Sequence, residues 1–246
     1  MKNIPATKPT FNKEDISFIS ENFSKILEGK SYLSQYKFSE EFEKSFASYI
    51  GTKYAVSCNS GTSALELIFR GIGVESKEVI LPSNTFIATA NAIMNAGGIP
   101  IFADCDETMC LSYEDTISKL SSKTIAICHV HIGGIVSNSS IRLAEYCKNN
   151  NIHFIEDSAQ GHGSKFDNKN AGSLGTAAGF SFFSTKVMTT GEGGMVTTND
   201  ENIWKYIWSF KDHGKSHDEV NKEKKPSGFQ WRHDSIGSNY RMTEMQ

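Results

Sequence analysis

Residues 54–103 read YAVSCNSGTSALELIFRGIGVESKEVILPSNTFIATANAIMNAGGIPIFA, in which three short apolar runs alternate with longer segments of helical spacing. Short β-rich runs separated by helices indicate βαβ crossovers, which place parallel strands between two layers of helices. The sequence therefore predicts an α/β fold of three layers, α/β/α, with a mostly parallel central sheet. The strands expected in this pattern are 54–58, 78–82, 99–103, 124–128 and 152–157, with helices from Thr62, Thr85, near Tyr113 and over 139–149.

The segments before and after residues 54–103 are expected to belong to the same large domain, which spans residues 1–246 and begins with a helical segment. Helices are predicted over 13–28 and 37–50. Two further strand-like runs, 179–183 and 193–198, are separated by a connection too polar and glycine-rich for an ordinary helix. The charge-rich stretch 211–228 is predicted to be a mobile surface loop, with a lid over the site as the alternative.

The charge, the apolar runs and the cysteine content of the sequence exclude several functional classes. The formal net charge of -3 gives no global basic field, so neither nucleic acid nor an anionic membrane is an expected partner. No apolar run is long enough to span a membrane, and the first residues lack the apolar stretch of a secretion signal. Five cysteines without a CxxC pair indicate reduced thiols, and no metal is expected beside His129 and His131, which alternate on one strand. A cytoplasmic location is therefore expected.

Ligands in open α/β sheets collect at the carboxyl ends of the strands. The first such end is followed by Ser60, Gly61 and Thr62, which turn the chain into a helix and leave backbone N–H groups unpaired at its start. This pattern is typical of a phosphate-binding cup, because glycine permits close approach and the hydroxyls donate to the anion. An ordinary serine or threonine N-cap accounts for the same residues.

Three further side chains follow other strand ends. Phe86, in the first turn of a helix, can stack on a flat cofactor, although core packing explains most such rings. Asp157 ends a buried strand, where a carboxylate needs a cationic partner such as a protonated ring nitrogen. Gln160 can hydrogen-bond a ring oxygen. A helix-capping or metal-binding acid is the alternative for the segment that begins with Glu156 and Asp157.

Lys186 lies between the last two expected strands, among small hydroxyls and glycines instead of carboxylates. Desolvation lowers a lysine pKa, and the neutral amine can form a Schiff base. Ser181, on the preceding strand, can give its hydroxyl to the same phosphate as the cup. An exposed turn lysine is the alternative.

Together these features provide a binding partner for each of four groups of one cofactor, pyridoxal 5′-phosphate. Its phosphate needs the cup, its ring a stacking face, its pyridine nitrogen an acid, and its aldehyde an amine. A nicotinamide dinucleotide is the nearest rival, but the glycines at 71 and 73 are followed by Ser76 where the dinucleotide fingerprint has glycine.

The strings NSGTSAL, PSNTFIATANAI, EDSAQGHG, FSFFSTKVMTTGEGG and GSNYRMTEMQ, in this order, resemble blocks of the DegT/DnrJ/EryC1/StrS sugar aminotransferases. The resemblance runs from about residue 15 to the end of the chain. It implies the aspartate aminotransferase (type I) fold of pyridoxal phosphate enzymes. Family members usually continue into a small C-terminal domain, which the sequence leads us to expect is absent here.

The resemblance also implies roles for single residues. Lys186 would bind the cofactor aldehyde, Asp157 would face the pyridine nitrogen, Gln160 the ring hydroxyl, and Phe86 the ring. Gly61, Thr62 and Ser181 would hold the phosphate. Asn239 would reach the cofactor phosphate of a partner subunit, so that a homodimer completes each active site.

The expected activity is transfer of an amino group from glutamate to a keto-sugar nucleotide, for amino-sugar and surface polysaccharide biosynthesis. Lys186 would move the proton at the reacting carbon, and Asp157 would keep the ring protonated. The alternative is a catalytically silent chain that keeps the fold and acts as a binding or assembly partner.

Overall fold

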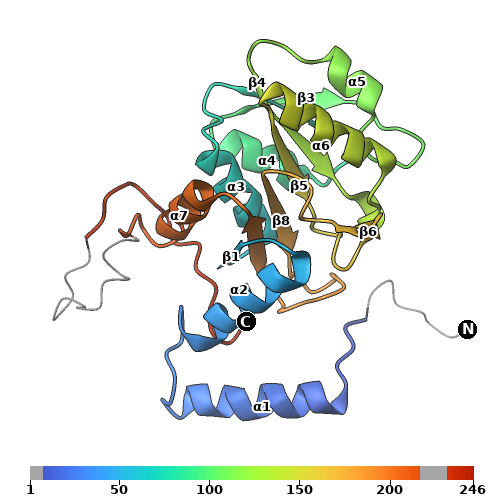
Figure 1. Ribbon diagram of the computed structural model, residues 1–246. Coiled ribbons are helices and arrows are strands. Elements are labelled where there is room, and N and C mark those ends of the chain that lie inside the picture. Colours follow the sequence, from blue (N-terminus) through green and yellow to red (C-terminus); the bar gives the residue numbers. More distant parts are fainter. Residues whose placement is uncertain (1–7, 217–231) are drawn as a thin grey trace, which may run out of the picture.

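A computed structural model describes residues 8–216 and 232–246. Its centre is a sheet with the strand order β1-β9-β8-β5-β4-β2-β3 (Figure 1). Strand β9 alone runs opposite to the other six strands, so the predicted mostly parallel sheet is confirmed. The strands of this sheet are β1 (Tyr54–Cys58), β2 (Glu78–Pro82), β3 (Ile99–Ala103), β4 (Thr124–Val130), β5 (His153–Asp157), β8 (Ala177–Ser181) and β9 (Gly194–Thr198).

Helices cover both faces of the sheet, which gives the predicted three layers (Figure 1). Alternate strand residues serve opposite layers: Val79 and Leu81 pack with one set of helices, and Ile80 between them packs with the other. One face carries α3 (Gly61–Gly71), α4 (Ile87–Asn95) and α7 (Glu201–Phe210). The other carries α2 (Lys37–Ile50), α5 (Tyr113–Ser118) and α6 (Asn138–Asn150).

Helix α1 (Lys13–Leu27) lies apart from these layers in Figure 1. Its start is fixed by a capping box, in which Asn12 and Asp15 bond each other's backbone N–H groups. Of its residues only Ile26 is buried. The helix therefore adds little to the buried core.

Three details differ from the sequence-based expectations or extend them. Strand β8 begins at Ala177, two residues before the predicted start, because its pairing with β5 and β9 begins there. Helix α7 and a small hairpin of β6 (Lys165–Phe166) and β7 (Lys169–Asn170) were not predicted. Of the predicted loop 211–228, residues 217–228 lie outside the described residues. For residues 211–216 the prediction of a mobile surface loop was wrong, because Lys211, Asp212 and Ser216 are buried and Lys211 pairs with Glu43.

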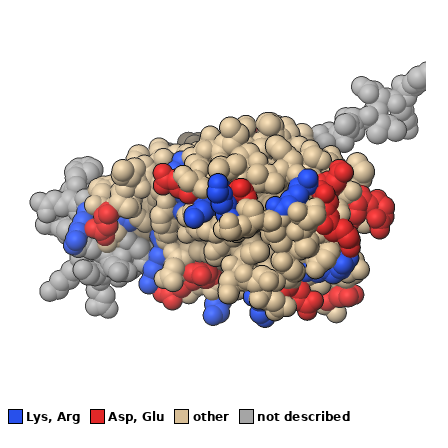
Figure 2. Space-filling model, turned by 90° about the horizontal axis from the view of Figure 1, so that it is seen from above, with Lys and Arg blue, Asp and Glu red and all other residues tan. Residues whose placement is uncertain are grey.

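Charges of both signs are interspersed on the face shown in Figure 2. A charged ligand therefore needs a local site there, because no broad field of one sign draws it in. Among residues 8–216 and 232–246, no helix has both the length and the apolar character needed to cross a membrane.

The parallel strands and β1 all point their carboxyl ends the same way. The segments after β1, β2, β4, β5 and β8 therefore meet at one edge of the sheet.

Candidate active site

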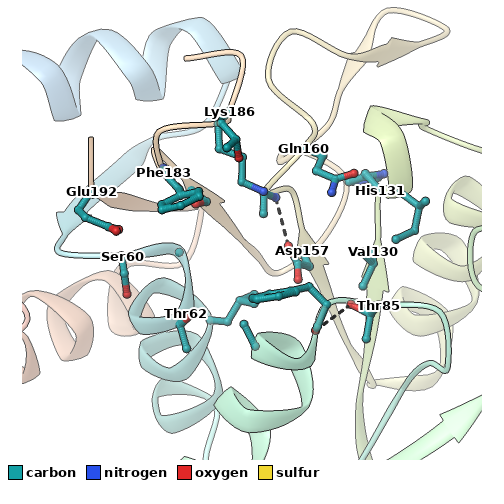
Figure 3. A pocket seen from close by; sticks show the side chains of 18 residues that line it. Ser60, Thr62, Thr85, Val130, His131, Asp157, Gln160, Phe183, Lys186 and Glu192 are labelled. Atoms are coloured by element: carbon teal, nitrogen blue, oxygen red, sulfur yellow. Dashed lines mark hydrogen bonds between the residues drawn. The ribbon is translucent and has the colours of Figure 1, made fainter. Parts of the chain in front are cut away.

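A pocket of about 390 Å³ lies at this edge, and eight of the nine predicted site residues line it (Figure 3). They are Ser60, Gly61, Thr62, Phe86, Asp157, Gln160, Ser181 and Lys186. The same pocket is also lined by residues that the sequence analysis did not assign to the site, including Thr85, His131, Phe183 and Glu192. The fold thus brings together side chains that lie up to 132 positions apart in the chain, from Ser60 to Glu192.

The start of α3 forms one wall. Ser60 is its N-cap, and the Ser60 hydroxyl accepts from the Ser63 N–H at 3.1 Å. The cap reading of Ser60 is therefore correct. The N–H groups of Gly61 and Thr62 have no acceptor within the helix, because its first hydrogen bond runs from the Ala64 N–H to the Ser60 carbonyl. A Cβ on Gly61 would lie 2.6 Å from the Ser181 Cβ, so only glycine lets the helix start against the end of β8.

Asp157 is buried at the end of β5 and lines the pocket. Its Oδ2 accepts from the Thr89 hydroxyl at 2.7 Å, and its Oδ1 accepts from the Ala159 N–H at 3.1 Å. Burial raises the pKa of the Asp157 carboxyl, while the Thr89 hydrogen bond and the Lys186 charge oppose that rise. Thr89 lies on α4 one turn after Thr85, and sequence reasoning missed it.

Lys186 enters the pocket from the connection between β8 and β9, and its side chain points toward Asp157 (Figure 3). Partial burial lowers the pKa of the Lys186 amine from its usual 10.5, and the Asp157 carboxylate opposes this shift. The connection turns back at the lysine, whose backbone N–H donates to the Phe183 carbonyl at 2.9 Å. A lysine in such a setting offers a neutral amine more readily than a fully solvated one.

Phe86 and Gln160 also line the pocket. Phe86 directly precedes α4 as its N-cap residue instead of lying in the first turn, and its ring is 76% exposed at the pocket. Gln160 is fixed by its Oε1, which accepts from the Gly133 N–H at 2.7 Å. Exposed aromatic and amide groups at a pocket are available to a flat polar ligand.

Asn239 is not among the residues lining this pocket. It pairs with Asp212 in an isolated β-bridge, and its Oδ1 accepts from the Arg241 N–H at 3.4 Å. The prediction for Asn239 concerned a partner subunit, and it stays a prediction.

Similar proteins were found by sequence and by structure. GDP-perosamine synthase of Escherichia coli O157:H7 is 37% identical over 247 residues, covering 100% of this chain and 64% of that protein. An aminotransferase of Psychrobacter cryohalolentis superposes with a TM-score of 0.88 at 35% identity, covering 97% of this chain and 61% of that one. PseC of Helicobacter pylori, an aminotransferase involved in pseudaminic acid biosynthesis, gives 0.88 at 30% identity, with 99% and 63% covered.

The chain therefore spans somewhat less than two thirds of the length of these relatives. The matched part contains the whole sheet and the pocket at its edge. A family profile matches residues 13–246, nearly the entire sequence. On this match and these likenesses, the chain belongs to the DegT/DnrJ/EryC1/StrS aminotransferase family.

Proposed function

We propose that this chain binds pyridoxal 5′-phosphate in the pocket and carries the catalytic groups of a sugar-nucleotide aminotransferase. The observation that carries the proposal is the placement of Lys186 and Asp157 in one pocket with the open start of α3. The amine suits the aldehyde of this cofactor, the buried acid its pyridine nitrogen, and the anion-binding start of the helix its phosphate. Family membership supports the same cofactor.

The residues fit the cofactor on physical grounds. Because Gly61 has no Cβ, the start of α3 can lie against Ser181. Gly61 and Thr62 line the pocket there, where a phosphate gains hydrogen bonds from backbone N–H groups and the helix dipole. Thr62 and Ser181 add hydroxyls beside it. Phe86 offers an exposed ring for stacking, and Asp157 is a buried carboxylate that gains from a cationic ring nitrogen.

When bound, pyridoxal phosphate supplies an aldehyde that links to amines and a ring that draws electrons from the adjacent carbon. Asp157 would hold the proton at the pyridine nitrogen, since its burial disfavours a lone carboxylate. Lys186 would hold the aldehyde and, once released, move the proton at the amine-bearing carbon of the substrate through its Nζ. The lowered pKa of Lys186 suits this general acid/base task.

The substrates are proposed as a keto-sugar nucleotide and glutamate. Similarity to GDP-perosamine synthase and to PseC supports a sugar nucleotide as amino acceptor. Glutamate as donor comes from the family resemblance. The identity of the sugar is a separate question, which a panel of keto-sugar nucleotides supplied with glutamate would answer.

Assembly and domain organisation are parts of the same proposal. We propose that the chain corresponds to the cofactor-binding large domain of its relatives and that two copies form a homodimer with shared active sites. Asn239 would then serve the partner's phosphate. All five cysteines are free thiols, which supports a reducing compartment such as the cytoplasm.

The test is covalent trapping. Purified protein mixed with pyridoxal phosphate should turn yellow, and borohydride should fix the cofactor on the peptide that contains Lys186. Lys186→Ala should lose the label and abolish transamination, while Lys169→Ala, which removes an exposed lysine, should keep both. A colourless mixture, a label on other lysines, or transamination by Lys186→Ala would overturn the proposal.

A further inference from the structure

On the Gln160 side of the pocket, His131, which lines it, pairs with Glu156, and the proposed chemistry does not use this buried pair. His131 and Glu156 are both fully buried, and His131 Nε2 lies 2.9 Å from Glu156 Oε2. The two Glu156 oxygens also accept from the backbone N–H groups of Gly172, Leu174 and Gly175, at 2.7, 2.8 and 3.1 Å. Three N–H donors stabilise the charged form of a buried carboxylate.

The contact of the second ring nitrogen indicates which nitrogens of His131 carry a hydrogen. His131 Nδ1 lies 3.2 Å from the Ile135 carbonyl oxygen, which can only accept a hydrogen bond. Nδ1 therefore carries a hydrogen, and Nε2 faces a carboxylate. Both nitrogens are donors only when the ring is the charged imidazolium. The geometry thus favours a buried imidazolium–carboxylate pair, in which the charges of His131 and Glu156 neutralise each other.

His129, near the end of β4, provides a contrast to His131, which directly follows that strand. His129 is also fully buried, and its ring centroid lies 5.1 Å from that of His131. Neither of its ring nitrogens has a hydrogen-bond partner among the described residues. Burial and the His131 charge hold the His129 pKa well below its usual value, so this ring is neutral.

The pair reaches the pocket through one short turn. Residues 132–135 are held to His131 by its ring bond to Ile135 and by the Gly134 N–H, which donates to the His131 carbonyl at 3.0 Å. Gly133 takes a φ of +59°, a conformation that favours glycine, and its N–H points to Gln160. Since a backbone N–H can only donate, the atom facing it is the Gln160 oxygen, and the amide NH₂ is left for the pocket.

We propose that His131 and Glu156 are positioning residues, an imidazolium–carboxylate pair that holds the 132–135 turn so that Gly133 fixes Gln160 as a hydrogen-bond donor in the pocket. The acceptor is an anionic oxygen on the ring of the bound ligand. The part that concerns the ligand rests on the proposed function. The pair and the turn are properties of the chain alone.

The first experiment needs no cofactor. In protein labelled with ¹⁵N-histidine, both ring nitrogens of His131 should resonate as N–H nitrogens at neutral pH, and His129 should show one N–H and one bare nitrogen. His131→Gln and His129→Gln assign the two sets of signals. A bare nitrogen on His131 in the unmodified protein overturns the charged pair.

The second experiment follows the turn through the exposed Gly133, whose amide hydrogen should exchange slowly because Gln160 accepts it. Protection should fall about tenfold in Gln160→Ala and by a similar factor in His131→Gln. His129→Gln, the same change in a buried histidine without partners, should leave it intact. Unchanged exchange in His131→Gln would show that the pair does not hold the turn.

The third experiment is a double-mutant cycle on pyridoxal phosphate affinity. Gln160→Ala and His131→Gln should each weaken binding about tenfold, and the double variant should be about tenfold weaker, not a hundredfold, because His131 acts through Gln160. Additive losses would overturn the positioning role. If the unmodified chain binds no pyridoxal phosphate, the proposed function fails, while the nitrogen signals and the Gly133 exchange still decide the pair and the turn.

Discussion

The Thr89 hydroxyl donates to Asp157 Oδ2 over 2.7 Å, which links the first turn of α4 to the end of β5 at the pocket. Both side chains are buried, so water does not replace this bond when it is lost. Thr89→Val keeps the shape and removes the donor. We expect the free energy of unfolding to fall by about 2 kcal/mol, since a buried carboxylate loses a hydrogen-bond donor. Urea unfolding of the cofactor-free protein at pH 7 measures this.

Thr89→Ser is the matched control, because it keeps the hydroxyl and removes only the methyl group. It should retain most of the stability that Thr89→Val loses. Loss of the bond also raises the pKa of Asp157 further, because the hydroxyl opposes the effect of burial. Equal stability of the valine and serine variants would show that the Thr89 hydroxyl contributes nothing.

Gly61→Ala tests the close approach of α3 to β8. The new methyl would lie 2.6 Å from the Ser181 Cβ, a separation that real Cβ atoms do not show, so the start of the helix must shift. We expect pyridoxal phosphate affinity, measured by absorbance titration, to fall at least about tenfold, as expected for the loss of one charge-assisted hydrogen bond.

Gly71→Ala, at the other end of the same helix, is the control for that variant. Its methyl would meet Tyr206 Cδ1 at 3.4 Å, an ordinary contact. Alanine in place of glycine at a helical position should raise stability by up to about 1 kcal/mol and leave cofactor affinity unchanged. Equal affinity losses in the two variants would contradict a specific role for the start of α3.

The site was largely predictable because parallel strands bring their carboxyl ends together. That rule placed Lys186, Asp157 and the start of α3 in one pocket without any knowledge of side-chain contacts. Helix α7 also left a signal: Asp200 caps it, and Ile203, Ile207 and Phe210 follow at helical spacing. It could have been predicted.

Other features had no local signal. Thr89 meets Asp157 across 68 positions, and His131 meets Glu156 across 25, so each pairing depends on how α4, β4 and β5 pack. The sequence showed that a buried acid at the end of β5 needs partners, and it placed His129 and His131 on one side of a strand. Which side chain contacts which carboxylate, Thr89 with Asp157 and His131 with Glu156, depends on the packing of the three layers.

Phe86→Leu separates ligand stacking from folding. The ring is 76% exposed, so its loss should change the free energy of unfolding by no more than about 0.5 kcal/mol. The stacking face is lost, however, and pyridoxal phosphate affinity should fall about fivefold. Met94→Leu, an exposed change on the same helix away from the pocket, should alter neither quantity. An unchanged affinity in Phe86→Leu would mean that the ring does not stack on the cofactor.

His162 should make the fold sensitive to mild acid. Its ring lies 5.5 Å from the Phe180 ring and 5.7 Å from the Phe182 ring, and burial lowers the His162 pKa to about 4. Above pH 6.5 the ring is neutral in both states and contributes no pH dependence. Between pH 6.5 and 4 the unfolded chain takes up a proton that the folded chain refuses, so stability falls as the pH falls. Below pH 4 both states are protonated and the loss is complete.

His162→Leu isolates that contribution, because leucine stays neutral between the same two rings. From pH 7 to pH 5 the unmodified protein should lose about 2 kcal/mol more unfolding free energy than the variant does. Urea unfolding at both pH values, on both proteins, gives this difference directly, and other titrating groups cancel in the comparison. If the two proteins lose the same stability over this range, the His162 ring takes up its proton in the folded state as easily as in the unfolded one, and its packing against Phe180 and Phe182 does not exclude the charge.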